Sequence, residues 1–178
     1  MLRLFVGIEF PPELKLRLSL LSTVMPGARW VDAGNFHLTL RFIGEVGRDV
    51  AADIDEALGR LRARRFTLQL AGTGVFGGDR PRALWVGVER EPELVSLHGK
   101  IEQALIRIGL DPEPRKFVPH VTLARLRDAS NQDVADYLSV RGYFPTRVFT
   151  ASRFVLFSSR ASTGGGPYVV EDSYALSA

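Results

Sequence analysis

The chain has 178 residues, of which 46% are hydrophobic and 24% charged, as in ordinary globular domains and unlike disordered or fibrous chains. The net charge is only +3 and is carried mostly by arginine, which permits an anionic partner and argues against a protein that coats DNA. The absence of cysteine excludes disulfides and thiolate metal sites, and no run approaches the ~18 apolar residues of a membrane span. We therefore expect a cytoplasmic protein without membrane contact and, by default, a monomer.

Hydrophobic periodicity predicts the same order of elements in each half of the chain: strand, long helix, strand, shorter helix, strand. The alternating residues at the start favour a strand over a signal peptide. The predicted strands are 2–10, 28–31, 36–43, 65–71, 83–89, 118–126, 147–158 and 167–175, and the predicted helices are 12–25, 49–63, 92–109 and 131–140.

This order predicts a single domain over residues 1–178, with pseudo-repeats at about 1–80 and 81–178. The expected fold class is α+β, with two pseudo-symmetric lobes of antiparallel sheet around a central cleft and helices outside. The helix at 12–25 is expected to bury a row of five leucines. The Gly-rich segments Gly72–Arg82 and Ser159–Gly166 are expected to be loops.

The motif His-x-Thr-Leu occurs twice, each time inside a predicted strand. Side chains two positions apart on a strand lie on the same face and are about 6–7 Å from each other, so His37 lies beside Thr39 and His120 beside Thr122. A pseudo-two-fold between the halves would bring the two pairs face to face. Two imidazoles with neighbouring hydroxyls would form an acid–base pair around a phosphate, because histidine titrates near neutral pH.

Three further residues near these motifs are candidates for substrate contact. Arg125 follows the second motif and can contact the same phosphate. Arg41, two residues beyond Thr39, is expected on the face that carries His37. Phe42 can stack a base, although core packing would explain it equally well. The third histidine, His98, lies in a predicted helix without this context and is expected to be structural or exposed.

The sequence segments around the motifs resemble those of a known family. The chain resembles the RNA 2′,3′-cyclic phosphodiesterases (2′-5′ RNA ligase family) of the two-histidine phosphoesterase superfamily. The resemblance covers residues 2 to about 175. It rests on four segments: Arg3-Leu-Phe-Val-Gly-Ile8, His37-Leu-Thr-Leu-Arg-Phe-Ile-Gly-Glu45, Pro81-Arg-Ala-Leu-Trp-Val-Gly-Val88 and Phe117-Val-Pro-His-Val-Thr-Leu-Ala-Arg125.

This resemblance implies metal-independent hydrolysis of RNA 2′,3′-cyclic phosphate ends to 2′-phosphate ends. It implies His37 as proton donor and His120 as proton acceptor, with Thr39, Thr122 and Arg125 binding the phosphate. The partners implied are RNA or nucleotides with 2′,3′-cyclic phosphate ends, and no metal or other cofactor is expected.

The sequence is also compatible with other functions. The same site can join RNA ends through a 2′-5′ linkage, although water is far more abundant than a competing RNA hydroxyl. A non-catalytic RNA- or nucleotide-binding module is a further alternative, which the intact histidines disfavour. A metal site built on the two histidines is disfavoured, because neither motif has an Asp or Glu nearby at the spacing of a metal ligand. The sequence leaves the physiological substrate open, whether tRNA fragment, oligonucleotide or mononucleotide.

Overall fold

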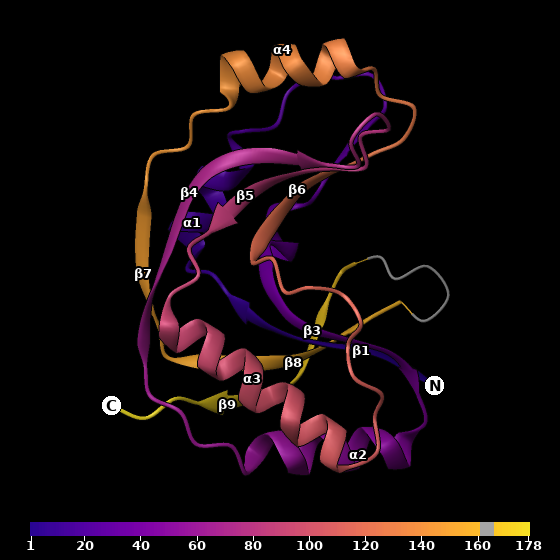
Figure 1. Cartoon of the computed structure of the whole chain (residues 1–178), viewed down its shortest axis with the longest axis vertical. Coiled ribbons are helices and arrows are strands. Elements are labelled where there is room, and N and C mark those ends of the chain that lie inside the picture. Colours follow the sequence, from indigo (N-terminus) through magenta and orange to yellow (C-terminus); the bar gives the residue numbers. More distant parts are fainter. Residues whose placement is uncertain (161–165) are drawn as a thin grey trace.

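The computed structural model describes residues 1–160 and 166–178, so most of the connector expected at Ser159–Gly166 lies outside the described residues (Figure 1). Within the described part, no helix is long and apolar enough to cross a membrane. The helices are α1 (Pro12–Ser19), α2 (Arg48–Gly59), α3 (Pro92–Arg107) and α4 (Asn131–Arg141), with a 3₁₀ turn, η1, at Ala33–Asn35. The strands are β1 (Leu2–Glu9), β2 (Ala28–Trp30), β3 (His37–Val46), β4 (Phe66–Phe76), β5 (Ala83–Val88), β6 (His120–Leu126), β7 (Arg147–Ala151), β8 (Arg153–Ser159) and β9 (Val169–Ala175).

The strands form two antiparallel sheets, which confirms the predicted α+β class with two lobes. One sheet has the order β3-β1-β8-β9 and the other the order β2-β6-β5-β4-β7. Helices α2 and α3 lie side by side at one end of the molecule, and α4 lies at the other end (Figure 1). The two strands that carry the His-x-Thr motifs, β3 and β6, therefore come from different sheets.

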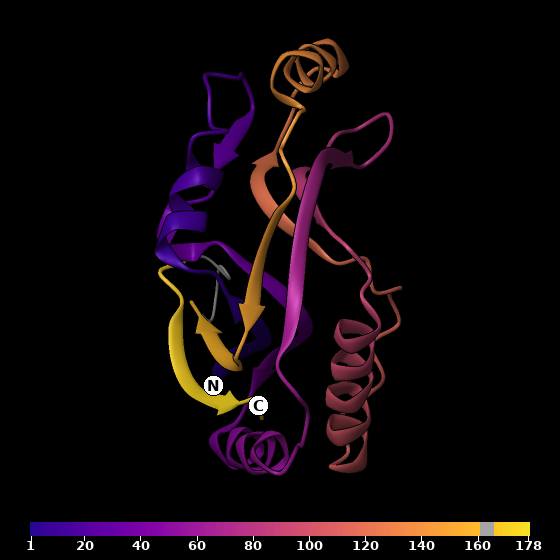
Figure 2. The same cartoon turned by 90° about the vertical axis from the view of Figure 1, so that its left-hand side faces the viewer.

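The sheets do not coincide with the halves of the chain. Strand β4 belongs to the first half but pairs with β5 and β7 in the five-stranded sheet. Strands β8 and β9 belong to the second half but extend the sheet that β1 and β3 begin. Strands β4 and β7 run side by side along the molecule, and β8 continues from β7 into the other sheet (Figure 2). Each half thus completes the sheet of the other.

One hydrophobic cluster joins both lobes, and period-two alternation places it. In β6, Val121 and Leu123 are fully buried, while His120 and Thr122, which alternate with them, stay partly accessible on the opposite face. Helix α3 contributes Leu94, Leu97, Ile101 and Leu105 at helical spacing, all of them buried. Burial of one such side chain stabilises the fold by about 1.5–3 kcal/mol, and this core holds the groove-facing residues in position.

Several predicted boundaries were wrong. The strand predicted at 147–158 is two strands, β7 and β8, which lie in different sheets, and helix α2 ends at Gly59 instead of residue 63. Helix α1 ends at Ser19 instead of Met25, because the hydroxyls of Ser19 and Ser22 bond to nearby backbone carbonyls and compete with helical bonding. Leu16 and Leu20, expected in the buried row, are 60% and 67% exposed. Leu16 lies on the side of α1 opposite to the buried Leu14 and Leu18, and Leu20 lies beyond the end of the helix. Strand β4 continues to Phe76, through the start of the predicted loop Gly72–Arg82.

Candidate active site

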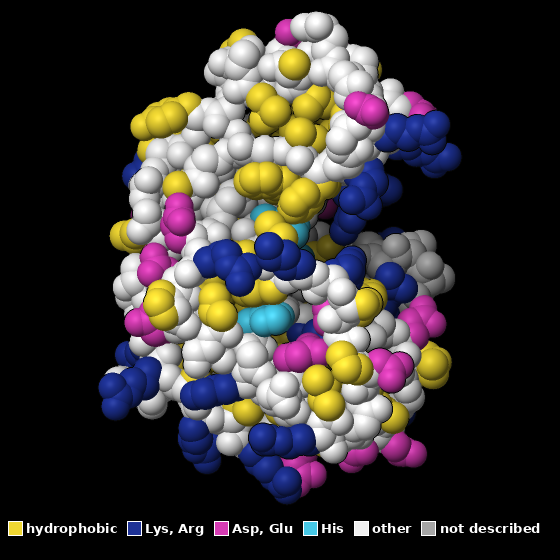
Figure 3. Space-filling view, viewed as in Figure 1, with side chains coloured by type: hydrophobic (Ala, Val, Ile, Leu, Met, Phe, Trp, Pro, Cys, Tyr) yellow, Lys and Arg dark blue, Asp and Glu magenta, His cyan; other side chains and the backbone are white. Residues whose placement is uncertain are grey.

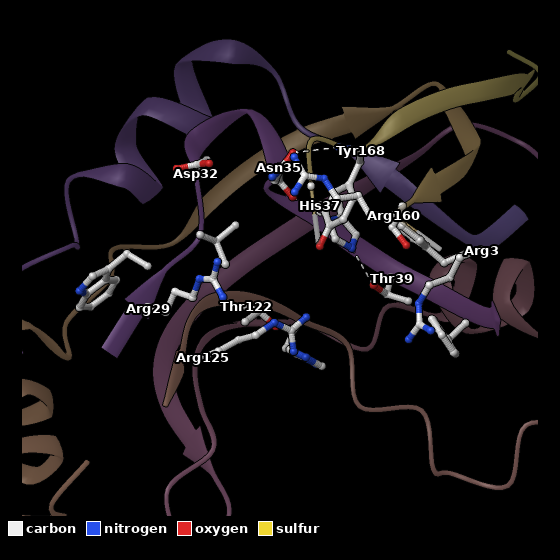
Figure 4. Close-up of a pocket in the computed structure, with 17 residues that line it drawn as sticks. Arg3, Arg29, Asp32, Asn35, His37, Thr39, Thr122, Arg125, Arg160 and Tyr168 are labelled. Atoms are coloured by element: carbon white, nitrogen blue, oxygen red, sulfur yellow. Dashed lines mark hydrogen bonds between the residues drawn. The ribbon is translucent and has the colours of Figure 1, made fainter. Parts of the chain in front are cut away.

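A groove of about 600 Å³ separates the two lobes, and both His-x-Thr pairs line it. Figure 3 shows the molecule hollowed on its right-hand side, with Lys and Arg side chains above and below the hollow. Four arginines and one aspartate are among the described residues that line the groove, which favours an anionic occupant. Figure 4 shows His37 and Thr39 on one wall and Thr122 and Arg125 on the other.

His37 is held by hydrogen bonds at both ring nitrogens. Its Nδ1 lies 2.8 Å from the carbonyl oxygen of Asn35, and its Nε2 lies 2.8 Å from Oγ1 of Thr39. A carbonyl can only accept, so Nδ1 carries the proton of the neutral ring. Nε2 is then an acceptor, and the Thr39 hydroxyl donates to it. Protonation of Nε2 would reverse this bond and free the hydroxyl to donate to a ligand in the groove.

His120 repeats the arrangement of His37. Its Nδ1 lies 2.7 Å from the carbonyl oxygen of Val118, which is again the residue two positions earlier. Nδ1 therefore carries the proton of neutral His120 as well, and Nε2 is left as the basic nitrogen. Among the described residues, no side chain bonds to that Nε2. The local backbone thus selects the same tautomer at both histidines.

Burial lowers the pKa of both histidines, and that of His37 more strongly. Burial lowers the pKa of His37 to about 4, and the positive charge of Arg125 adds to the effect. The rings of Phe5 and Tyr168 exclude water from it, with centroids 4.8 Å and 5.2 Å from the imidazole. Burial also lowers the pKa of His120 below its ordinary value of 6.5. Both imidazoles in the groove are therefore predominantly neutral at pH 7.

Matching β-bulges decide which later residues of each motif strand reach the groove. The register of β1 against β3 skips Leu40, and that of β5 against β6 skips Leu123. Each bulge reverses the alternation beyond it, so the fifth residue after each histidine turns inward. These residues are Phe42 and Arg125, and both line the groove.

The expected position of Arg41 was wrong. The bulge turns its side chain away from the groove, where it is only 7% exposed. Its Nε lies 2.6 Å from a carboxylate oxygen of Glu102 on α3, and its other nitrogens bond to the backbone carbonyls of Phe42 and Asp111. Arg41 therefore ties the motif strand to the helix layer and is not available to a ligand in the groove.

His98, expected to be structural or exposed, lies on α3 and does not line the groove. Its ring stacks on that of Phe117, with centroids 4.0 Å apart and planes 3° apart. This contact accounts for the third histidine of the chain.

Sequence reasoning missed several residues of the groove. Asn35 accepts a hydrogen bond from the backbone N–H of Tyr168 through its side chain, while its carbonyl orients His37. Arg3 reaches in from β1, with its guanidinium 5.1 Å from the ring centroid of Phe42. Arg29 enters from β2. No local pattern marks these residues, because they come from elements that meet only in the folded chain.

The comparisons with known proteins agree with this geometry. A family model described as "2′-5′ RNA ligase superfamily" matches residues 27–163. The chain belongs to that superfamily. A protein of Aeropyrum pernix named RNA 2′,3′-cyclic phosphodiesterase is 46% identical over 119 residues, which cover 66% of this chain and 67% of that protein. A protein of Escherichia coli with the same name is 32% identical over 178 residues, covering 98% and 96% of the two chains.

Solved structures share the whole fold. The crystal structure of Escherichia coli LigT in complex with 3′-AMP aligns with a TM-score of 0.79 at 29% identity, over 99% of both chains. These comparisons confirm the resemblance to the 2′-5′ RNA ligase family that the sequence motifs indicate. They also confirm the two-lobed fold around a groove.

Proposed function

We propose that this protein is an RNA 2′,3′-cyclic phosphodiesterase, which opens the cyclic phosphate at an RNA end and leaves a 2′-phosphate. The observation that carries the proposal is the pair of His–Thr units on two walls of one arginine-lined groove, each imidazole with its Nδ1 proton donated to a carbonyl. Ring opening needs one group to take a proton and another to give one. The names of the relatives support the same reaction.

In the proposed reaction, water attacks phosphorus in line with the 3′ oxygen. The Nε2 atom of His120 takes the proton from water as the new P–O bond forms. The bond between phosphorus and the 3′ oxygen breaks, and His37 gives its Nε2 proton to that oxygen. The products are a 2′-phosphate monoester and a free 3′ hydroxyl, and the positions of the protons on the two histidines are exchanged.

The hydroxyls of Thr39 and Thr122, with Arg125, are proposed to bind the non-bridging phosphate oxygens, where charge increases in the transition state. Phe42 is retained as a candidate contact for the nucleoside. For His37 to act as donor, the bound phosphate must first raise its low pKa. Attraction between the anion and the imidazolium supplies that shift, and proton uptake then frees the Thr39 hydroxyl for the phosphate.

End joining through a 2′-5′ linkage is the second candidate, favoured by the name of the superfamily. An RNA hydroxyl would replace water as the nucleophile in the same groove. Hydrolysis is preferred because water greatly outnumbers RNA ends. An assay that contains both the cyclic end and a second RNA with a free hydroxyl end measures the ratio of the two products directly.

The decisive experiment offers an oligonucleotide with a 2′,3′-cyclic phosphate end to the purified protein in the presence of a chelator, and maps the phosphate of the product. A 2′-phosphate is expected, with unchanged rate in chelator. The variants His37→Ala and His120→Ala should each lose about 10²–10⁴ in rate. Binding without turnover by the native protein would instead favour the non-catalytic module. Loss of activity in chelator and recovery with zinc would contradict the metal-independent mechanism.

The roles of the two histidines can be separated with an activated leaving group at the 3′ position, which departs without a proton. Such a substrate should restore the rate of His37→Ala and not that of His120→Ala. The reverse pattern would exchange the two roles.

The proposal also takes the enzyme to be monomeric and cytoplasmic, in keeping with a sequence that has no cysteine. Light scattering of the purified protein and fractionation of cells test these two points.

A further inference from the structure

Two arginines from neighbouring strands lie directly opposite each other at one end of the groove. Arg29 on β2 pairs in register with Arg125 on β6. Residues directly opposite in an antiparallel pair share a face, with Cβ atoms about 4.5–5.5 Å apart. Both arginines line the groove, and Figure 4 shows them at the end of the groove opposite to that of Arg3.

This pair carries a cost that the folded chain does not offset by itself. Like charges directly opposite on adjacent strands destabilise a sheet. In residues 1–160 and 166–178, no carboxylate lies within 4.0 Å of either guanidinium, although Asp32 lines the same end of the groove. An anion placed between the guanidiniums would remove the repulsion and receive two planar donor groups.

The pair is displaced from the place proposed for the reacting phosphate. That phosphate is expected between Thr39 and Thr122. Arg125 is three residues beyond Thr122, up to about 10 Å along the strand, and Arg29 lies on the next strand outward. One Arg125 guanidinium can bridge both positions, whereas Arg29 serves only the outer one.

We infer that Arg29 and Arg125 form a second phosphate subsite, which binds the phosphate on the 5′ side of the terminal nucleotide. The inference rests on the proposed function and narrows its substrate class. A nucleoside 2′,3′-cyclic phosphate with a free 5′ hydroxyl fills only the reacting position. An RNA end, or a nucleotide that carries a 5′-phosphate, fills both. The groove is thus built for ends of RNA chains in preference to simple cyclic mononucleosides.

The test compares two substrates that differ in one group, adenosine 2′,3′-cyclic phosphate with a 5′ hydroxyl and with a 5′-phosphate. The native protein should have the higher kcat/KM for the 5′-phosphorylated substrate. Arg29→Gln should lower kcat/KM for that substrate by about 10–100-fold, the range for one lost charge-assisted contact, and should lower it much less for the 5′-hydroxyl substrate. Arg29→Lys should keep part of the preference, because it retains the charge and loses the planar fork.

A matched control removes the same charge elsewhere. Arg107→Gln on α3 does not touch the groove, so the preference should persist if the effect is local. Equal losses in Arg29→Gln and Arg107→Gln would mean that only net charge steers the substrate. An equal loss of Arg29→Gln on both substrates, or no loss on either, would overturn the subsite.

A binding measurement separates this inference from the proposed reaction. Calorimetry compares adenosine 2′,5′-bisphosphate with adenosine 2′-monophosphate, in the native protein and in Arg29→Gln. The native protein should bind the bisphosphate more tightly, and the variant should bind both alike. Absence of turnover together with this binding pattern would reject the hydrolase and keep the subsite. Turnover without any preference for the 5′-phosphate would do the opposite.

Discussion

The role proposed for His37 as proton donor requires a large change of its pKa when an anion enters the groove. In the free protein burial lowers that pKa to about 4. At pH 7 only about 0.1% of the free molecules then carry the proton that the reaction needs, since each unit of pH above the pKa reduces that fraction about tenfold. Sulfate is a suitable probe, because it imitates a bound phosphate and stays a dianion over the whole range of interest.

The expected size of the change follows from the distance between the charges. One anionic oxygen about 4 Å from the imidazolium, at an effective dielectric constant of about 20, stabilises the protonated form by about 4 kcal/mol. One pKa unit corresponds to about 1.4 kcal/mol, so saturating sulfate should raise the pKa of His37 by about 3 units, to about 7. By reciprocity, sulfate should bind more tightly as the pH falls through this range.

The measurement is an NMR titration of the imidazole signals with and without sulfate. The chain has three histidines, so His98→Asn and His120→Asn variants assign the signals. If the pKa of His37 stays near 4 while calorimetry shows sulfate bound, His37 cannot be the donor in the complex. The donor would then be His120, whose pKa is lowered less in the free protein.

Four further outcomes test other parts of the structure. Thr39→Val should lower kcat/KM by about 10–10³-fold, because it removes one donor to the developing charge; an unchanged rate would make the hydroxyl purely structural. Arg41→Met should lower the free energy of unfolding by about 3–5 kcal/mol, measured by urea denaturation, because it removes the ion pair of the largely buried Glu102 and leaves that carboxylate only the backbone N–H of Glu113, while activity per folded molecule persists. Gly7→Ala should lower both the activity and the free energy of unfolding, the latter by about 1–3 kcal/mol, because the new Cβ would lie 2.6 Å from a backbone carbonyl oxygen of β3. The control Gly34→Ala has open space around its Cβ and should change neither property in thermal melts and rate assays. Finally, the free protein should lose stability as the pH falls from about 6.5 toward 4, because the unfolded imidazole of His37 takes a proton that the folded one resists, and sulfate should reduce this loss.

Strand alternation predicted the groove face of each motif as far as the threonine. His37 and Thr39 face the groove as expected, because the apolar Leu38 between them is buried in the core and neighbouring side chains on a strand point to opposite faces. Beyond Thr39 the sequence continues to alternate, so nothing local reveals the bulge that buries Arg41 and exposes Phe42 to the groove.

The second motif does carry a signal of its bulge. Leu123 and Ala124 are two apolar residues in succession, which breaks the alternation before Arg125. Alignment of the two motifs at their histidines places Phe42 beside Arg125. This alignment would have predicted the inward position of Phe42 from the sequence alone.

Other parts of the groove depend on long-range contacts that no local pattern contains. The bond from Tyr168 to Asn35 joins residues 133 positions apart. The register of Arg29 against Arg125 likewise requires that β2 leave its own half of the chain. The two halves were predicted from the repeated order of elements. The order of strands in each sheet could not be predicted, because the sequence of a strand does not show which other strand it pairs with.

The exchange of strands between the halves has a consequence for how the enzyme becomes active during folding. Since β4 completes one sheet and β8 the other, neither half of the chain has a finished sheet until both have folded. A fragment that ends before β5 would present His37 on a sheet lacking β8, with an unpaired edge open to aggregation. The separation of the two histidines then depends on the hydrophobic core that both halves share. A growing chain on the ribosome would gain its catalytic geometry in one late step, after β8 has emerged.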